Sequence, residues 1–238
     1  MRIPRFYINS KIGVGQTILL ENQQHHHLAK VLRKKRDDLV TLFNGTGPEF
    51  LGKIDETCAQ KTKIKIIDIS QSTKTPRIKI KLGMCVLKRE AMNSAITKCT
   101  ELGVSEITPI FSDFCSVPKK LIAKKKQHWQ KLAIFACEQS GLNLIPIINE
   151  PISMENWFKR SKEQAFIAIQ TGKKLEATLT ENSSVYLLIG PEGGFSQSEL
   201  DLSIREGAIP VKFGDRILRA ETAPIVAISM LYNAAGEF

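Results

Sequence analysis

The sequence predicts an α/β protein, with a mostly parallel sheet from residue 77 onward and a small antiparallel sheet or barrel before it. In Lys63–Ile66, basic and apolar residues alternate, which is typical of a strand with one face in water and one on a core. From Ile78 onward, apolar runs that fit strands alternate with segments of helical periodicity, which indicates a parallel sheet. The chain has 238 residues, 42% of them hydrophobic, enough for one large domain or two small ones.

Short strands dominate the first 70 residues, and turn residues such as Asn44-Gly45 and Gly47-Pro48 separate them. We expect strands at Phe6–Ile8, Thr17–Leu20, Leu39–Phe43, Phe50–Ile54 and Lys63–Ile69, and a helix near Gln24–Arg33. Residues 71–76 are polar and end in Pro76. They predict a linker between a domain at residues 1–70 and a second at residues 77–238.

Strands and helices alternate in the second domain. We expect strands at Ile78–Val86, Glu106–Phe111, Leu144–Ile148, Ala165–Ile169, Val185–Ile189 and Val211–Phe213, and helices at Ala91–Leu102, Lys119–Ser140, Met154–Ser161, Ser196 to about Gly207 and Thr222 to about Ala235. Ser196 stands three residues before Glu199, the spacing of a capping box at a helix start. Gly103 fits a helix C-terminus, and Pro224 fits a first helical turn.

The composition narrows the classes of partner and compartment. Lys and Arg number 34 against 24 Asp and Glu, a net charge of +10 that favours a polyanionic partner. The five cysteines are widely spaced and never form a CxxC pair, which fits a reducing cytosol. No apolar run approaches the length of a membrane span, and no apolar stretch follows the early Arg residues. We therefore expect a cytoplasmic protein with no membrane partner.

Two basic segments of the first domain allow alternative interpretations. His25-His26-His27 suggests a metal site, but consecutive helical residues point in different directions, so we expect no metal and a structural or RNA-facing role. Arg33-Lys34-Lys35-Arg36 is either a solvated turn or a phosphate contact.

Two loop-to-helix junctions carry the candidate site: GPEGGFSQSEL from Gly190, and GDRILRAETAPIVA from Gly214. Each follows an apolar strand, and the carboxyl ends of parallel strands are where open α/β sheets bind ligands. The glycine spacing fits neither the dinucleotide fingerprint nor the phosphate loop. Glu192, Arg219 and Glu221 also place more charge there than a turn requires.

These motifs resemble the RsmE-like family, S-adenosylmethionine-dependent rRNA uridine-N3 methyltransferases of the SPOUT superfamily. The resemblance extends to PRFYI at Pro4, HHHLAKVLR at His25, KCTELGVSEITPI at Lys98 and WQKLAIFACEQSG at Trp129, so it covers nearly the whole chain. It implies a PUA-like RNA-binding β-barrel, a methyltransferase domain with a C-terminal trefoil knot, and a homodimer. The helix at Thr222 is a plausible dimer contact, although burial within the domain explains its apolar circumference equally well.

The resemblance also implies roles for individual residues. The cofactor S-adenosylmethionine is expected against Ile189, Gly190, Glu192, Gly193, Gly194, Phe213, Gly214, Ile217, Leu218, Arg219, Ala220, Thr222 and Ala223. For Phe213 and Ile217, core packing is the alternative. Contacts with RNA, which is small-subunit rRNA or the assembled small subunit, are expected from Arg33, Lys34, Lys88, Glu138 and Gln139.

Methylation at uridine N3 requires that the imide proton leave, because neutral N3 has no available lone pair. A cation near the uracil oxygens lowers the N3 pKa, and we assign this role to Arg219. Glu221 and Glu192 are candidate bases, yet either can instead orient Arg219 through a salt bridge.

The chain departs from the family pattern at three places. It has Lys88-Arg89-Glu90 where a Lys-Gly-Asp-like step is expected, Leu142 where an Arg is usual, and Gln170-Thr171-Gly172 in place of a His-Pro-Glu-like stretch. The first two departures bear on RNA contacts and the third on the first cofactor loop. A non-catalytic RNA-binding assembly factor and a SPOUT enzyme acting on tRNA are the alternative functions.

Overall fold

The computed structural model describes residues 3–71, 75–122, 124–161, 163–175 and 179–237. The chain forms two compact units, one of residues 1–75 with 137–144 and one of residues 76–136 with 145–238. Of the predicted linker, residues 72–74 lie outside the described residues.

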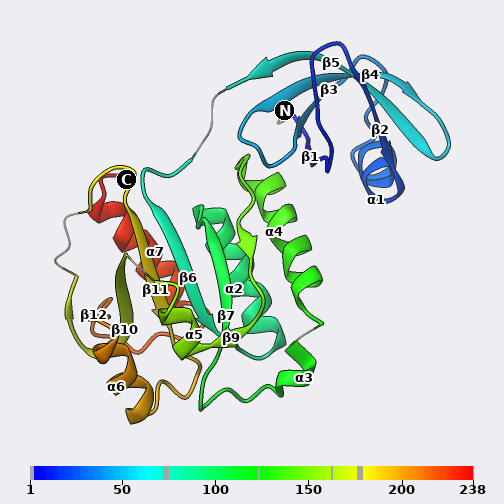
Figure 1. Ribbon diagram of the computed structural model, residues 1–238. Coiled ribbons are helices and arrows are strands. Elements are labelled where there is room, and N and C mark those ends of the chain that lie inside the picture. Colours follow the sequence, from blue (N-terminus) through cyan, green and yellow to red (C-terminus); the bar gives the residue numbers. More distant parts are fainter. Residues whose placement is uncertain (1–2, 72–74, 123, 162, 176–178, 238) are drawn as a thin grey trace. The chain divides into compact units, whose positions relative to one another are not determined.

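One five-stranded sheet forms the first unit (Figure 1). Its strands are β1 (Arg5–Tyr7), β2 (Thr17–Glu21), β3 (Leu39–Phe43), β4 (Glu49–Thr57) and β5 (Lys61–Ser70), in the order β1-β3-β4-β5-β2. β1 pairs with β3 in parallel, and the other neighbours are antiparallel. The alternation in β5 buries Ile64 and Ile66 and exposes Lys65, as the pattern predicts. Closure of this sheet into a barrel stays a prediction.

The predicted helix near Gln24 is an α-helical turn followed by a π-helical turn, α1 (Asn22–His26) and η1 (His27–Val31). His25 is buried, with Nδ1 2.9 Å from the Thr62 hydroxyl and Nε2 3.2 Å from the Ala59 carbonyl oxygen. His27 packs edge-on against Phe6. These contacts hold the helix against the sheet. Within the described ranges, no group of three His, Cys, Asp or Glu side chains could hold a metal ion.

The second unit is built on a seven-stranded sheet. Its strands are β6 (Lys79–Cys85), β7 (Glu106–Phe111), β8 (Ile147–Ile148), β9 (Ile152–Ser153), β10 (Gln164–Lys174), β11 (Ser184–Ile189) and β12 (Ile209–Lys212). The order is β12-β10-β11-β6-β7-β8, with β9 also paired to β7. The pairs among the described strands are parallel. The carboxyl ends of these strands therefore meet at one edge.

Helices cover both faces of this sheet (Figure 1). They are α2 (Arg89–Leu102), α3 (Lys119–Ile122), α4 (Lys126–Ser140), α5 (Met154–Phe158), α6 (Gln197–Arg205) and α7 (Ala223–Ala234). Leu187 of β11 packs into a core with residues of α2 and α7, and its neighbour Leu188 packs into another with Trp157 of α5. Both faces of β11 are thus buried, which explains its continuous apolar run. None of the described helices is long and apolar enough to cross a bilayer.

Helix α7 lies largely inside the unit. Ala227, Ile228, Leu231 and Tyr232 are fully buried, whereas Met230 is 38% exposed. Burial within the domain therefore accounts for one side of this apolar helix, while Ile225 and Val226 are half-buried.

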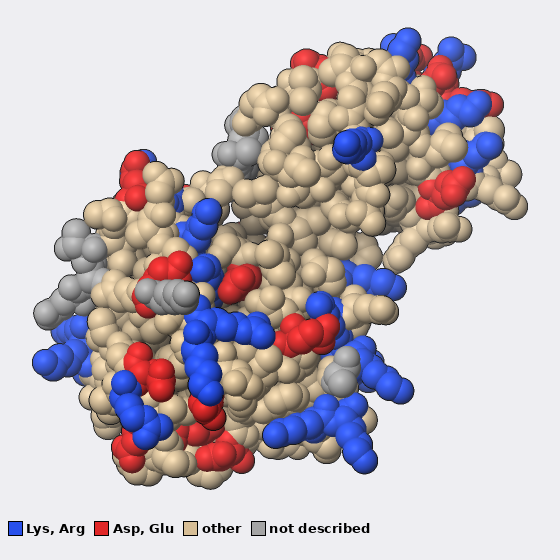
Figure 2. Space-filling model, in the orientation of Figure 1, with Lys and Arg blue, Asp and Glu red and all other residues tan. Residues whose placement is uncertain are grey.

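The prediction of one long helix at Lys119–Ser140 is wrong, because the structure has two helices, α3 and α4. Ile122 and Trp129 are both buried and lie about two helical turns apart, so the apolar period is the same for one helix or two. Figure 2 shows Lys and Arg side chains gathered over α3. The strand predicted at Leu144 begins only at Ile147, since Pro146 has no N–H for the ladder.

Strand β10 continues to Lys174, past the predicted end at Ile169. Both Ala168 and Lys173 align with Val211 of β12, so the residues between them form an irregular bulge. A Cβ at Gly172 would lie 2.6 Å from backbone atoms of Val211. Glycine is required there because the two backbones approach this closely. The trefoil knot that the family resemblance implies stays a prediction.

Candidate functional site

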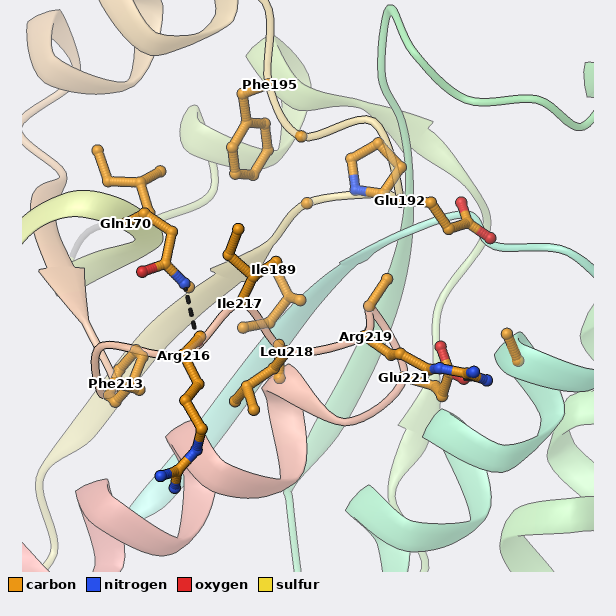
Figure 3. A pocket seen from close by; sticks show the side chains of 18 of the residues that line it. Gln170, Ile189, Glu192, Phe195, Phe213, Arg216, Ile217, Leu218, Arg219 and Glu221 are labelled. Atoms are coloured by element: carbon orange, nitrogen blue, oxygen red, sulfur yellow. Dashed lines mark hydrogen bonds and ion pairs between the residues drawn. The ribbon is translucent and has the colours of Figure 1, made fainter.

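A pocket of about 820 Å³ opens at the carboxyl edge of the seven-stranded sheet (Figure 3). The residues that line it come from the start of the irregular stretch within β10, from the ends of β11 and β12, from the loops that follow β6, β11 and β12, and from helices α2, α6 and α7. Its volume lies within the range of small-molecule sites, about 300–1,000 Å³. Four neighbouring strands of the parallel sheet, β12, β10, β11 and β6, thus contribute residues or the loops that follow them to one cavity.

The loop after β11, residues 190–196, forms one wall. The Gly194 N–H donates to the Pro191 carbonyl at 2.9 Å and closes a tight turn, in which Gly194 has φ of 72°. Because this φ is left-handed, glycine is favoured at that position. Phe195 packs over Gly190, where a Cβ would come within 3.0 Å of the ring. The glycines therefore shape the loop so that backbone and an aromatic ring face the cavity.

Glu199 fixes the end of this loop. It forms the predicted capping box with Ser196, since its Oε2 accepts from the Ser196 N–H at 2.9 Å. Its Oε1 accepts from the Asp113 N–H, also at 2.9 Å. Glu199 is buried, with only 7% of its surface exposed. The Ser196 hydroxyl donates to Asp113 Oδ2 at 2.6 Å. One carboxylate therefore joins the loop after β7 to the loop after β11.

The loop between β12 and α7 forms the opposite wall. Gln170 Nε2 donates to the Arg216 carbonyl at 3.2 Å, and Lys212 Nζ lies 2.8 Å from Asp215 Oδ1. At the other end, the N–H groups of Thr222 and Ala223 both donate to the Arg219 carbonyl at 2.9 Å. This loop is consequently held at its start, its middle and its end.

Charged side chains surround the pocket mouth. Lys88, Arg216 and Arg219 supply positive charge, and Glu192 and Glu221 supply negative charge. Arg219 lies 4.0 Å from Glu221, and the Arg219 side chain is 87% exposed (Figure 3). An ion pair this long and exposed is weak. The guanidinium is therefore available to a ligand, with Glu221 beside it.

Most of the residues predicted to bind the cofactor line this one pocket. They are Ile189, Gly190, Glu192, Gly194, Phe213, Ile217, Leu218, Arg219, Ala220 and Ala223. Three other predicted residues, Gly193, Gly214 and Thr222, are not among the described residues that line the pocket. A Cβ at Gly193 would instead lie 3.1 Å from the Phe114 Cβ, on the side of the loop after β7. Ile217 is 89% exposed, so the alternative of core packing is wrong for it, whereas Phe213 does pack against the core.

The sequence prediction missed several lining residues. These are Ala91, Ala168, Ile169, Pro191, Phe195, Leu200, Val211 and Arg216. Ala168, Ile169 and the lining residue Gln170 lie where the predicted strand from Ala165 ends, so the rule that ligands bind at strand ends was a usable signal for them. Arg216 lies inside the second motif, between two residues that were predicted.

The residues predicted to contact RNA fall in both units. Lys88 is exposed and lines the pocket. Arg33 is exposed and Lys34 half-buried after η1, and Gln139 is exposed near the end of α4. Glu138 is half-buried and accepts from the Tyr7 N–H at 2.9 Å, so it holds β1 within the first unit. Burial raises the pKa of the Glu138 carboxyl, against the opposing effects of the Tyr7 N–H and of Arg5.

Two family models match the chain. The RNA methyltransferase domain matches residues 73–232, and the RNA methyltransferase PUA domain matches residues 20–67. Together they define an RNA methyltransferase domain that follows a PUA domain.

Curated relatives specify the family further. The ribosomal RNA small subunit methyltransferase E of Buchnera aphidicola from Schizaphis graminum is 40% identical, over 99% of this chain and 98% of the relative. That of Rickettsia conorii is 31% identical, over 97% of this chain and 96% of the relative. The chain belongs to the ribosomal RNA small subunit methyltransferase E family.

Solved structures agree with this fold. The ribosomal RNA small subunit methyltransferase E of Neisseria gonorrhoeae, bound to S-adenosyl methionine, has a TM-score of 0.91 at 29% identity and covers 98% of both chains. A Legionella pneumophila structure in complex with the cofactor SAM has a TM-score of 0.90 at 33% identity and covers 99% of both chains. The predicted fold class, a parallel α/β methyltransferase domain that follows a PUA-like domain in the sequence, is confirmed.

Proposed function

We propose that this protein transfers a methyl group from S-adenosylmethionine to N3 of a uridine in small-subunit rRNA. The observation that carries the proposal is the pocket itself, where both sequence motifs meet and an exposed guanidinium stands at the mouth. Its relatives are named ribosomal RNA small subunit methyltransferases, which supports rRNA as the substrate, and two solved relatives hold the cofactor.

The residues present fit S-adenosylmethionine. The cavity of about 820 Å³ has apolar walls from Ile189, Leu218 and Val211 for an adenine, and the turn at Gly194 brings backbone groups close to the space. Glu192 supplies a carboxylate that attracts the positive charges of this cofactor. When bound, the cofactor supplies a methyl group carried on a sulfonium.

Arg219 acts on the uracil ring in this proposal. Loss of the N3 proton places negative charge on the ring, which its two carbonyl oxygens share. The Arg219 guanidinium, whose ion pair with Glu221 is 4.0 Å long, can turn to donate to such an oxygen. It therefore favours the anion whose N3 lone pair takes the methyl group.

Glu221 has two possible tasks in the same step. Its side chain is 26% exposed, so it is shielded more than Arg219 but still reaches water. It can accept the N3 proton, or it can orient Arg219 without touching the proton. The pH profile of single-turnover methylation in an E221Q variant separates these tasks, because only a base adds an ionisation that its removal abolishes.

Substrate and assembly follow from the same proposal. The substrate is rRNA or the assembled small subunit in the cytoplasm, and the working form is a homodimer. Contacts with RNA come from Lys88 at the pocket mouth, from Arg33 and Lys34 in the first unit, and from Gln139.

The test combines labelled S-adenosylmethionine with small subunits from cells that lack the activity, followed by mass spectrometry of the rRNA. A methyl group on uridine N3 supports the proposal. In R219A we expect at least a hundredfold loss of methylation with cofactor affinity within about threefold of wild type. Unchanged turnover in R219A would refute the role of Arg219. Wild-type protein that binds the cofactor and RNA without turnover would instead support the non-catalytic assembly factor.

A further inference from the structure

A run of basic residues beside the pocket is not used by the proposed chemistry. From Phe114 to Cys137 the sequence has no Asp or Glu, and it contains six lysines. Lys119, Lys120 and Lys124 are exposed on α3 and the turn that follows it. We name these three residues the α3 lysine surface.

The core of the second unit anchors the backbone of the α3 lysine surface. Ile122 and Trp129 are both only 3% exposed and belong to the main core of the second unit. The Lys125 N–H donates to the Ile122 carbonyl at 2.8 Å, which fixes the turn between α3 and α4. Lys119 Nζ stands 5.2 Å from the centre of the Phe111 ring, at the end of β7. The lysine backbones are thus anchored while their side chains reach solvent.

The positive charge of this surface is not compensated locally. In the part of the chain that the structure describes, no carboxylate forms an ion pair with Lys119, Lys120 or Lys124. By contrast, Lys126 is paired with Glu150 at 2.8 Å, Lys98 with Glu101 of its own helix, and Lys159, directly after α5, with Glu155 of that helix. Figure 2 shows the basic side chains over α3 as a group.

The surface continues directly from the pocket wall. Asp113 is hydrogen-bonded to Ser196 and Glu199 at the end of the glycine loop, and Phe114 packs beside Gly193. Only four residues separate Phe114 from Lys119. A polyanion that enters the pocket mouth can therefore extend along the loop after β7 onto α3.

We propose that the α3 lysine surface binds the phosphate backbone of the RNA that flanks the methylated nucleotide. The proposal rests on the proposed function, because it takes RNA as the substrate of the neighbouring pocket. Three ammonium groups that form no ion pair with a described carboxylate match the spacing-tolerant, sequence-independent contacts by which lysines hold phosphates. The surface therefore contributes affinity and register rather than base specificity.

The test compares the triple variant K119Q/K120Q/K124Q with the control K79Q/K98Q/K159Q. The control removes the same charge from three exposed lysines elsewhere in the second unit, of which Lys98 and Lys159 are already ion-paired. Binding of undermodified small-subunit rRNA is measured as a function of salt. We expect the α3 variant to bind about tenfold to fiftyfold more weakly, with a salt slope lower by about 2, because each single-strand phosphate contact contributes about 0.7.

Three further measurements make the outcome decisive. S-adenosylmethionine affinity and the melting temperature should stay at wild-type values in the α3 variant, and K119R/K120R/K124R should restore RNA binding. Equal weakening in the control would overturn the proposal, since diffuse charge would then suffice. Wild-type RNA affinity and salt slope in the α3 variant would overturn it as well. Absence of methylation by the wild type, with RNA binding still dependent on these lysines, would instead reject only the proposed function.

Discussion

Replacing Glu199 with glutamine tests whether one buried carboxylate holds two loops of the site together. Glu199 accepts two backbone N–H groups at 2.9 Å, from Asp113 and from Ser196. Glutamine keeps one acceptor oxygen but presents an NH2 group to the other N–H. One charge-assisted bond is then lost and the other becomes a neutral bond. Hydrogen bonds to charged groups contribute about 1.5–3 kcal/mol, so we expect the free energy of unfolding to fall by about 2–3 kcal/mol.

The assay is urea unfolding followed by fluorescence and circular dichroism, beside titration with S-adenosylmethionine. E206Q is the matched control, since Glu206 caps the other end of the same helix and is exposed. We expect the control to lie within about 0.5 kcal/mol of wild type. We also expect weaker cofactor binding in E199Q alone, because Phe195 and Gly190 of the released loop line the pocket. Equal stability of the two variants would refute this account of Glu199.

Two other predictions follow. G172A should lower the free energy of unfolding by at least about 1–3 kcal/mol, because its Cβ would lie 2.6 Å from the Val211 backbone. Thermal or urea unfolding measures this, and a wild-type value would contradict the close approach of the two strands. Burial raises the pKa of Glu138, so the folded protein favours the protonated carboxyl over the ionised one. The contribution of the protonated carboxyl to the free energy of unfolding is therefore lost as pH rises through that pKa. The stability of E138Q relative to wild type should therefore increase from about pH 4 to about pH 7, and a constant difference would contradict it.

The sequence predicts the second unit well where strands are buried on both faces. Val185–Ile189 is a continuous apolar run, and the structure places it in the middle of a parallel sheet with cores on both sides. The capping box at Ser196 is local chemistry and is likewise confirmed. Features set by neighbours in sequence were thus predictable from sequence.

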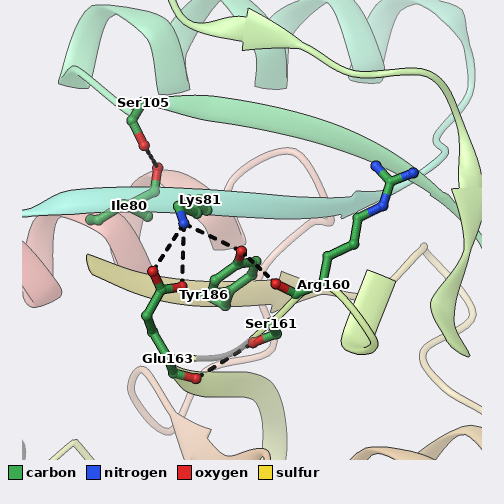
Figure 4. Close-up of polar contacts among 7 residues, drawn as sticks. All are labelled: Ile80, Lys81, Ser105, Arg160, Ser161, Glu163 and Tyr186. Atoms are coloured by element: carbon green, nitrogen blue, oxygen red, sulfur yellow. Dashed lines mark hydrogen bonds and ion pairs between the residues drawn. The ribbon is translucent and has the colours of Figure 1, made fainter. Parts of the chain in front are cut away.

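Features set by tertiary contacts could not be predicted from the sequence. The break between α3 and α4 leaves the apolar period unchanged, and β10 continues past Ile169 because β12 pairs with it beyond the bulge. The interaction of Lys81 with Glu163 and Tyr186 joins residues 82 and 105 positions apart (Figure 4). Lys81 Nζ lies 3.2 Å from both Glu163 oxygens, and the Tyr186 hydroxyl donates to the Arg160 carbonyl at 3.0 Å. No local pattern marks such partners.

The same distinction explains which site residues were found. Residues 189–194 and 213–223 belong to two motifs, and most of those predicted there line the pocket. Gln170 instead comes from the irregular stretch within β10, and its amide donates to the Arg216 carbonyl of the second motif. Gln170-Thr171-Gly172 stands here in place of the His-Pro-Glu-like stretch that the family resemblance leads one to expect. Gly172 permits the close contact with β12, and Gln170 fastens the loop that carries Arg219, so the residues at this departure support the pocket of this chain directly.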